Sequence, residues 1–352
     1  MKETKLSLGQ LLAAVYLGLT ALAAEALPGS IGGGGLAWLA PLLLLIPALP
    51  LSGIAAGKNQ EGGRCAGLTA LLGKGGGRIL AAVFLLWGVF LLGINVARSA
   101  RRLAAGGGEG ALLALLILAM GIWMAWGRIA AFGRSCELFS MAFGLGLVVV
   151  VLFALFRIQP DYVLLATWKE VAGLPGGILT TVGIAGIGVY ALFLGEDVDR
   201  RKGDRGRVVR WITALCITQS LMLLLVLGRL GANLTSMVER PFFQMVAGIG
   251  LAGAFQRLEA LISALWLLGD LALAGLLLLA CRRLLGLTVG KKEKGWFSLI
   301  PAVPALILAW GFMGQEGMTE TLLALVVPVG GLLVGALIFL LWGLGAKRKT
   351  TK

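Results

Sequence analysis

The sequence predicts an all-α integral membrane protein in which ten transmembrane helices form one bundle. Hydrophobic residues make up 59% of the 352 residues and charged residues only 14%, which is far from the usage of a soluble globular domain. Apolar runs long enough to cross roughly 30 Å of hydrocarbon as a helix occur ten times. The connections between these runs are short, so we expect a single polytopic membrane domain over residues 1–352.

The ten expected helices divide into two halves of five, an organisation typical of transporters built from two inverted repeats. The first repeat covers about residues 7–157 and the second about 174–344, followed by a cytoplasmic tail at 345–352. The helices are expected at residues 7–27, 36–56, 77–98, 111–126, 136–157, 174–194, 207–228, 255–281, 296–313 and 321–344.

Lysine and arginine residues indicate the orientation of the chain. If the N-terminus is cytoplasmic, 23 of the 31 basic residues fall on the cytoplasmic side, as the positive-inside rule requires. The outer side keeps eight, among them Arg98, Arg101 and Arg102. We therefore expect both termini in the cytoplasm. The net charge of +14 is then a topology signal and an attraction to anionic lipid, not a nucleic-acid footprint.

Other residue types exclude several function classes. The first 26 residues could pass for a secretory signal, but nine further spans follow, so we expect a transmembrane helix there. The four cysteines form no CxxC pair or disulfide framework, and the chain has no histidine. A metal site, a bound cofactor and catalysis by a histidine-dependent triad are therefore not expected, and the protein is not predicted to be an enzyme.

The first helix of each repeat contains glycine and threonine residues in its middle. Unwinding there would free N–H groups that favour a carboxylate and C=O groups that favour an ammonium ion, and an amino acid offers both. The alternative is that the glycines only pack helix against helix. For the sixth helix we favour an interruption because threonines accompany the glycines, whereas for the first helix both possibilities stay open. The residues concerned are Gly18 and Thr20, and Thr180, Thr181, Gly183 and Gly186.

A polar stripe runs down the expected helix at residues 255–281. Glu259, Ser263, Trp266 and Asp270 are spaced by 4, 3 and 4 residues and share one face, which we expect to look into the bundle. Asp270 falls near the middle of the span, where an ionisable group costs roughly 2.5 to 3.5 kcal/mol on insertion scales. An ion pair to a neighbouring helix and a ligand or proton site are equally good explanations.

Two other polar features lie in the spans. Asn95 is deep in the third helix, where its amide needs a partner, and we favour packing over ligand contact. Arg134 and Glu137 are three residues apart near the start of the fifth helix, so we expect them to pair at the membrane interface.

Several segments, taken together and in order, resemble a known family. They are KLSLGQ with Ser7 and Gln10, AWLA at 37–40, GRIAAFGRSCELF at 127–139, and the set Pro241, Phe255, Arg257, Leu258, Glu259 and Trp266. The chain is similar to the membrane B subunit of Ger-type nutrient germinant receptors of endospore-forming bacteria, a branch of the amino acid/polyamine/organocation transporter superfamily. It departs from the family after Glu196, where DVDRRKGDRGR replaces the usual apolar continuation towards a proline.

The resemblance implies a LeuT-like fold with interrupted first and sixth helices. A small nutrient such as an amino acid would bind between helices 1, 3, 6 and 8, in the inner membrane of the spore. The partners would be a larger membrane subunit and a lipoprotein subunit. The expected ligand-binding residues are Gly18, Thr20, Asn95, Thr180, Thr181, Gly183, Gly186, Ser263, Trp266 and Asp270.

Two other function classes remain open. The chain could be an amino-acid permease coupled to protons or sodium, with Asp270 or Glu25 as the ion-coupled carboxylate. It could also be an inert membrane scaffold for receptor assembly, which predicts no ligand binding.

Overall fold

The structure confirms an all-helical membrane protein. It is a computed structural model that describes residues 5–29, 34–46, 64–105, 107–163, 171, 173–199, 204–248, 258–291, 293–315 and 317–337. Within these residues, seven helices are long and apolar enough to cross a membrane, and two shorter apolar helices accompany them. These nine helices coincide with nine of the ten expected spans. The remaining expected span, 36–56, lies partly outside the described residues.

The described elements follow one another in a simple order. They are β1 (Leu6–Ser7), α1 (Leu8–Gly29), η1 (Gly35–Leu39), α2 (Ala40–Leu43), α4 (Arg64–Ala104), α5 (Gly110–Trp126), α6 (Ile129–Leu155), η2 (Pro160–Tyr162), α7 (Gly173–Ile187), η4 (Gly188–Asp197), β2 (Val198–Asp199), α8 (Asp204–Met237), α9 (Pro241–Ala247), α10 (Leu258–Val289), η5 (Gly295–Ser298), α11 (Leu299–Met313), α12 (Met318–Thr321) and η6 (Leu322–Val326). Most η elements are 3₁₀-helices, whereas η6 is a π-helical stretch within the helix that runs to Leu337.

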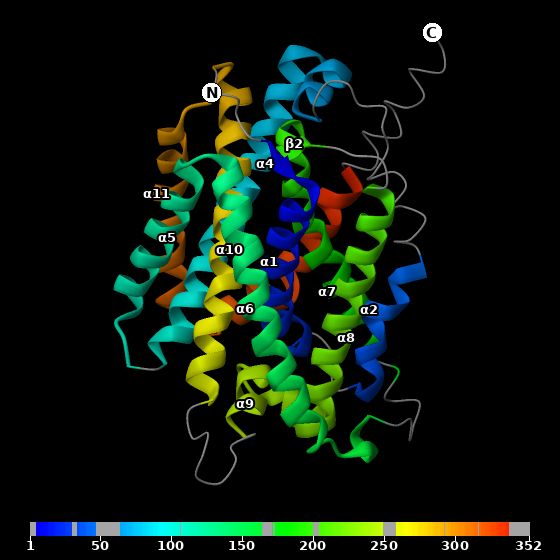
Figure 1. Ribbon diagram of the computed structural model, residues 1–352. Coiled ribbons are helices and arrows are strands. Elements are labelled where there is room, and N and C mark those ends of the chain that lie inside the picture. Colours follow the sequence, from blue (N-terminus) through cyan, green and yellow to red (C-terminus); the bar gives the residue numbers. More distant parts are fainter. Residues whose placement is uncertain are drawn as a thin grey trace.

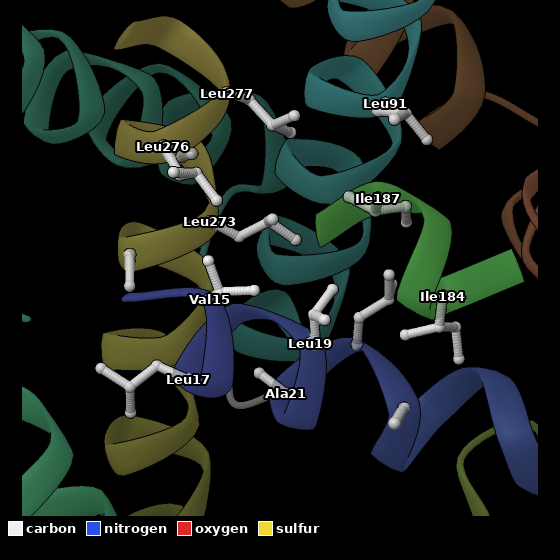
Figure 2. Packing of buried hydrophobic residues seen from close by; sticks show 14 of the residues in the cluster. Val15, Leu17, Leu19, Ala21, Leu91, Ile184, Ile187, Leu273, Leu276 and Leu277 are labelled. Carbon is white, nitrogen blue, oxygen red and sulfur yellow. The ribbon is translucent and has the colours of Figure 1, made fainter. Parts of the chain in front are cut away.

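The long helices stand side by side, with α1 and α10 in the middle of the bundle (Figure 1). The apolar stretches of both are 78% buried inside the protein, compared with 22% for α6, whose outer face is covered with exposed leucine and valine. Leucine and isoleucine side chains from α1, α4, α7 and α10 interdigitate where these four helices meet (Figure 2). The helices that define the centre are therefore those that the sequence analysis numbered 1, 3, 6 and 8.

The start of α1 is held by a reciprocal cap and by a short strand pair. The backbone N–H of Ser7 donates to the Gln10 side chain at 3.1 Å, and the backbone N–H of Gln10 donates to the Ser7 hydroxyl at 3.2 Å. This is the capping-box arrangement, which satisfies N–H groups that the first helical turn leaves unpaired. Leu6 and Ser7 pair in parallel with Val198 and Asp199 of β2, so the beginning of α1 lies beside the end of η4.

Replacing Ser7 by alanine is expected to lower the free energy of unfolding by about 1 kcal/mol, because the cap of α1 is lost. Thermal unfolding of the detergent-purified protein measures the effect. Ser140→Ala is the matched control, because that exposed hydroxyl donates only to the Glu137 carbonyl within its own helix. Equal midpoints for the two variants would show that the cap does not stabilise α1.

The interruption expected in the first helix is absent, because α1 is a continuous α-helix from Leu8 to Gly29. Gly18 serves close packing instead: a Cβ atom there would lie 2.8 Å from the Cβ of Leu273 on α10. The sixth helix does change from one helix type to another, but at a later residue than predicted. It is α-helical to Ile187 and continues as the 3₁₀-helix η4 from Gly188, so Thr180 to Gly186 lie in regular α-helix.

Candidate functional site

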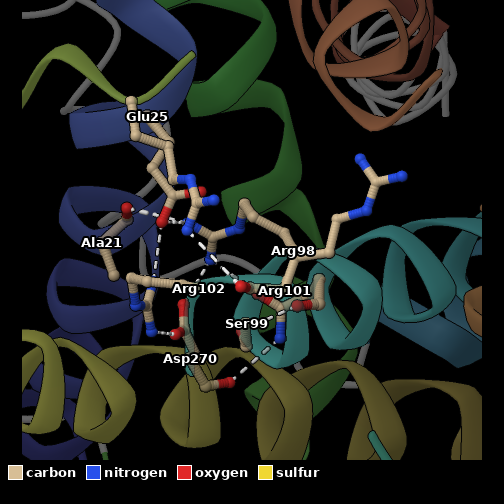
Figure 3. Close-up of polar contacts among 9 residues, drawn as sticks. Ala21, Glu25, Arg98, Ser99, Arg101, Arg102 and Asp270 are labelled. Atoms are coloured by element: carbon tan, nitrogen blue, oxygen red, sulfur yellow. Dashed lines mark hydrogen bonds and ion pairs between the residues drawn. The ribbon is translucent and has the colours of Figure 1, made fainter. Parts of the chain in front are cut away.

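Four charged side chains from three helices form a buried network beside the centre of the bundle (Figure 3). Nη1 of Arg98 and Nη1 of Arg102 lie 3.2 Å and 2.7 Å from Oε1 of Glu25. The same two arginines donate to the two carboxylate oxygens of Asp270. The exposed fraction is 2% for both arginine side chains, 6% for Glu25 and 0% for Asp270. Two positive and two negative charges balance, which is the condition for keeping such groups out of water.

Hydrogen bonds to neutral groups complete the network. Nη2 of Arg98 donates to the Asn95 side-chain oxygen at 3.0 Å, and Nη1 donates to the Ala21 carbonyl at 3.0 Å. The Asn95 side-chain amide donates to the Asp270 carbonyl at 3.1 Å. The guanidinium of Arg102 also lies over the Phe243 ring, 5.2 Å from its centroid. The network thus ties α1, α4 and α10 together with one contact to α9.

The buried position of Arg98 and Arg102 was not foreseen from the sequence, where they were counted only as basic residues of the outer side of the membrane. Helix α4 extends to Ala104, and both side chains turn inward, with 3% and 4% of the residue exposed. The spacing of Asn95, Arg98 and Arg102 by 3 and 4 residues places all three on one helix face. This polar face of α4 could have been paired with the polar stripe of α10 that carries Asp270. It is the signal in the sequence that could have identified the partners of Asp270.

A small cavity of about 10 Å³ adjoins this network at the centre of the bundle. This is the room that one water occupies. Asn95 is the polar residue in its lining, and eight aliphatic side chains make up the rest. They are Leu22, Leu91, Ile94, Ile187, Leu273, Leu277, Leu323 and Val327. The cavity therefore lies between α1, α4, α7, α10 and η6, in the region where the sequence resemblance implied a ligand.

A second set of polar contacts lies further along α10. Arg283, also on α10, donates to the Phe193 carbonyl at 2.9 Å and to the Asp197 carboxylate, and its Nε lies 3.3 Å from Glu293. Thirteen residues separate Asp270 from Arg283, roughly 20 Å along the helix axis. Leu273 and Leu277, which line the cavity, lie between these two residues along α10.

The polar stripe on α10 faces inward at one end only. Asp270 and Trp266 are fully buried, Ser263 is half-buried and Glu259 is exposed. The Trp266 ring packs between aromatic side chains of α6 and α9, with centroid distances of 4.6 Å to Phe143 and 4.6 Å to Phe242. Trp266 is therefore part of an aromatic cluster and does not line the cavity.

The glycine and threonine residues of α7 serve helix packing. A Cβ on Gly183 would overlap Pro328, and one on Gly186 would overlap the backbone of Gly331, so α7 and the last helix touch backbone to backbone. The Thr181 hydroxyl donates to the Gly177 carbonyl of its own helix at 2.7 Å. Thr180 is buried, as is Thr20 on α1, and neither lines the cavity. Among the expected ligand-binding residues, Asn95 lines the cavity and is joined there to Asp270.

The expected Arg134–Glu137 pair does not form in the described structure. Arg134 donates to the Ala130 carbonyl at 3.3 Å, and Glu137 accepts from the Gln10 side-chain amide at 3.3 Å. The three-residue spacing would allow Arg134 and Glu137 to pair, but the Glu137 carboxylate is hydrogen-bonded to Gln10 at the start of α1 instead. Phe255 and Arg257, which contribute to the family resemblance, lie outside the described residues.

Comparisons with known proteins identify the fold. No protein-family model matches the chain, and no curated protein sequence matches it. Several solved structures, by contrast, match it over nearly its whole length. A Na⁺-coupled sialic acid symporter in a substrate-bound outward-open state is 12% identical, with a TM-score of 0.65, covering 93% of this chain and 78% of that one. MhsT in complex with L-phenylalanine is 16% identical, with a TM-score of 0.67, covering 96% and 90%.

The third structure is the manganese transporter of Eremococcus coleocola in complex with an aromatic bis-isothiourea substituted compound. It is 15% identical, with a TM-score of 0.57, covering 94% of this chain and 75% of that one. These identities show the fold alone. The chain has the LeuT-type fold of membrane transporters.

Proposed function

We propose that the protein binds a small nutrient, such as an amino acid, at the central cavity and acts as the membrane subunit of a spore germinant receptor. The transporter fold supports a small-molecule site, and MhsT, a protein of similar fold, is seen with L-phenylalanine. The sequence resemblance supports the receptor role. The protein then resides in the inner membrane of the spore, with both termini cytoplasmic, and works with a larger membrane subunit and a lipoprotein.

The position of the cavity beside the charge network is the observation that carries this proposal. An amino acid has an ammonium group, which suits Asp270 or Glu25, and a carboxylate, which suits Arg98. Asn95 borders the cavity and bonds to two members of the network, so it would sense a ligand directly. These side chains replace the backbone groups that we expected to hold the ligand, because α1 and α7 are uninterrupted there.

The cavity is too small for an amino acid in this conformation, so binding requires the surrounding helices to separate. A ligand that binds only the opened form shifts the equilibrium towards it, which is how occupancy would reach partner subunits. Ser263, Trp266, Thr20 and the α7 threonines would take part through this repacking.

Asn95→Ala is expected to weaken nutrient binding at least about tenfold, because one lost hydrogen bond to a charged ligand group is worth about 1.5 to 3 kcal/mol. The measurement is thermal stabilisation of the detergent-solubilised protein by each of the twenty amino acids, followed by titration of those that stabilise it. Ser99→Ala is the matched control, because its buried hydroxyl donates to the Asn95 carbonyl and does not line the cavity. Equal affinities for wild type and Asn95→Ala would refute the assignment of the cavity. No stabilisation by any amino acid would favour an inert scaffold.

An ion-coupled amino-acid permease is the second candidate, and the similarity to three transporter structures favours it. Uptake of labelled amino acids by proteoliposomes holding this subunit alone, driven by a proton or sodium gradient, would support the permease. Binding without uptake would support the receptor, as would genes for a large membrane subunit and a lipoprotein beside this one.

A further inference from the structure

The last helix changes its hydrogen-bonding pattern beside the central cavity. Residues Leu322–Val326 form the π-helical stretch η6, and the N–H of Val327 donates to the carbonyl of Leu322, five residues earlier. A π-helical turn inside an α-helix is rare and is frequently found at functional sites. Leu323 and Val327 both line the cavity, so the irregular turn borders the cavity directly.

This turn leaves the carbonyl of Leu323 without a donor from its own helix. In an α-helix that oxygen would accept from the N–H of Val327, which donates to Leu322 instead. The next N–H along the chain would be that of residue 328, which is a proline and has none. In the part of the chain that the structure describes, no side chain donates to the Leu323 carbonyl either. A backbone acceptor is therefore left over at the wall of the cavity.

A second polar group without a partner lies one turn away. Thr319 precedes Leu323 by four residues and so lies on the same face of the helix. Its hydroxyl is buried and has no hydrogen-bond partner among the described residues. Buried polar groups are nearly always paired, because an unpaired one destabilises the folded state. Two such groups on the helix face that borders the cavity indicate that a bound molecule completes this wall.

We propose that the carbonyl of Leu323 accepts a hydrogen bond from the ammonium group of the bound amino acid. The inference rests on the proposed function and adds the last helix to its site. Both carboxylates of the charge network are already paired with Arg98 and Arg102, so an ammonium group would have to compete with an arginine there. The Leu323 carbonyl has no such competitor. Asn95 lines the same cavity, and its amide carries a second N–H for the carboxylate of the ligand.

Pro328→Ala tests this assignment, because alanine supplies the missing N–H. In the π-helical turn that N–H donates to the Leu323 carbonyl and competes with the ligand. The contact with α7 is kept, because the atoms nearest to a Cβ on Gly183 are backbone atoms of Pro328 and not its ring. Pro304→Ala is the matched control, because it removes the proline inside α11, which does not line the cavity.

The experiment titrates detergent-solubilised protein, followed by thermal unfolding, with an amino acid that stabilises wild type and with the same acid lacking its amino group. We expect Pro328→Ala to bind the amino acid about tenfold more weakly than wild type, as for the loss of one hydrogen bond to a charged group. The deaminated acid should bind both proteins equally, and Pro304→Ala should match wild type for both ligands.

Two results would overturn the inference and leave the proposed function intact. One is equal affinity of wild type and Pro328→Ala for the amino acid. The other is an equal loss of affinity for the amino acid and for the deaminated acid, because the effect would then not involve the ammonium group. If the alanine variant cannot be purified, Pro328→Gly supplies the same N–H.

A simpler probe decides the inference if none of the twenty amino acids stabilises wild type, which is the result that refutes the proposed function. Butylammonium chloride offers an ammonium group for the carbonyl and an alkyl chain for the aliphatic lining of the cavity. Stabilisation of wild type and Pro304→Ala but not of Pro328→Ala, relative to equal NaCl, would support the Leu323 site. Equal responses of the three proteins, or no response, would overturn it.

Discussion

Replacing Asp270 by asparagine is expected to lower the free energy of unfolding by about 3 to 5 kcal/mol, the usual effect of removing one partner of a buried ion pair. The variant keeps the shape of the side chain but leaves Arg98 and Arg102 with Glu25 as their remaining carboxylate partner in the network. One uncompensated positive charge then stays buried among α1, α4 and α10. The unfolding midpoint in detergent, together with the yield of monodisperse protein, reports the loss.

Two controls separate charge balance from loss of a contact. Glu259→Gln removes an exposed carboxylate from the same helix and should leave the midpoint unchanged. The double variant Arg102→Met/Asp270→Asn restores neutrality, so it should recover part of the stability that Asp270→Asn loses. A wild-type midpoint for Asp270→Asn alone would mean that the network does not hold the helices together.

Gly186→Leu is expected to destabilise the protein by at least about 3 kcal/mol, the upper part of the range for overpacked sites. A Cβ at this position would overlap the backbone of Gly331, which cannot swing away as a side chain could. The leucine can be accommodated only if α7 separates from the last helix. Loss of the folded fraction during size-exclusion chromatography at rising temperature measures the effect.

Gly144→Leu provides the matched control, because it makes the same substitution within helix α6, where a Cβ would have no neighbour within 4 Å. We expect this variant to elute and unfold like wild type. Similar losses in both variants would assign the effect to leucine in a membrane helix in general, and not to contact between α7 and the last helix.

The spans were predictable because hydrocarbon imposes a length and an apolar composition on each helix, as α6 and α11 illustrate. The inward direction of Trp266 and Asp270 was predictable from helical periodicity. The partners of Asp270 were not, because they depend on how α4 is rotated and shifted against α10. The third helix was expected to end at residue 98, so Arg98 and Arg102 were counted with the connection that follows it, whereas α4 continues to Ala104.

The glycines of the sixth helix illustrate a different limit. Small residues at helical spacing permit both a break in the backbone and a close approach of two helices. Which of these occurs depends on what lies opposite, and Pro328 and Gly331 lie about 150 residues away in sequence. Local sequence therefore identified Gly183 and Gly186 as special positions but could not assign their role.

The pairing of β1 with β2 requires an even number of membrane crossings between them. Leu6 and Val198 are neighbours, so the chain that leaves one must return to the same face of the bilayer to reach the other. Only an even number of crossings permits this, and the six spans expected between these residues satisfy the condition. The pairing of four strand residues thus provides a check on the number of membrane crossings between them.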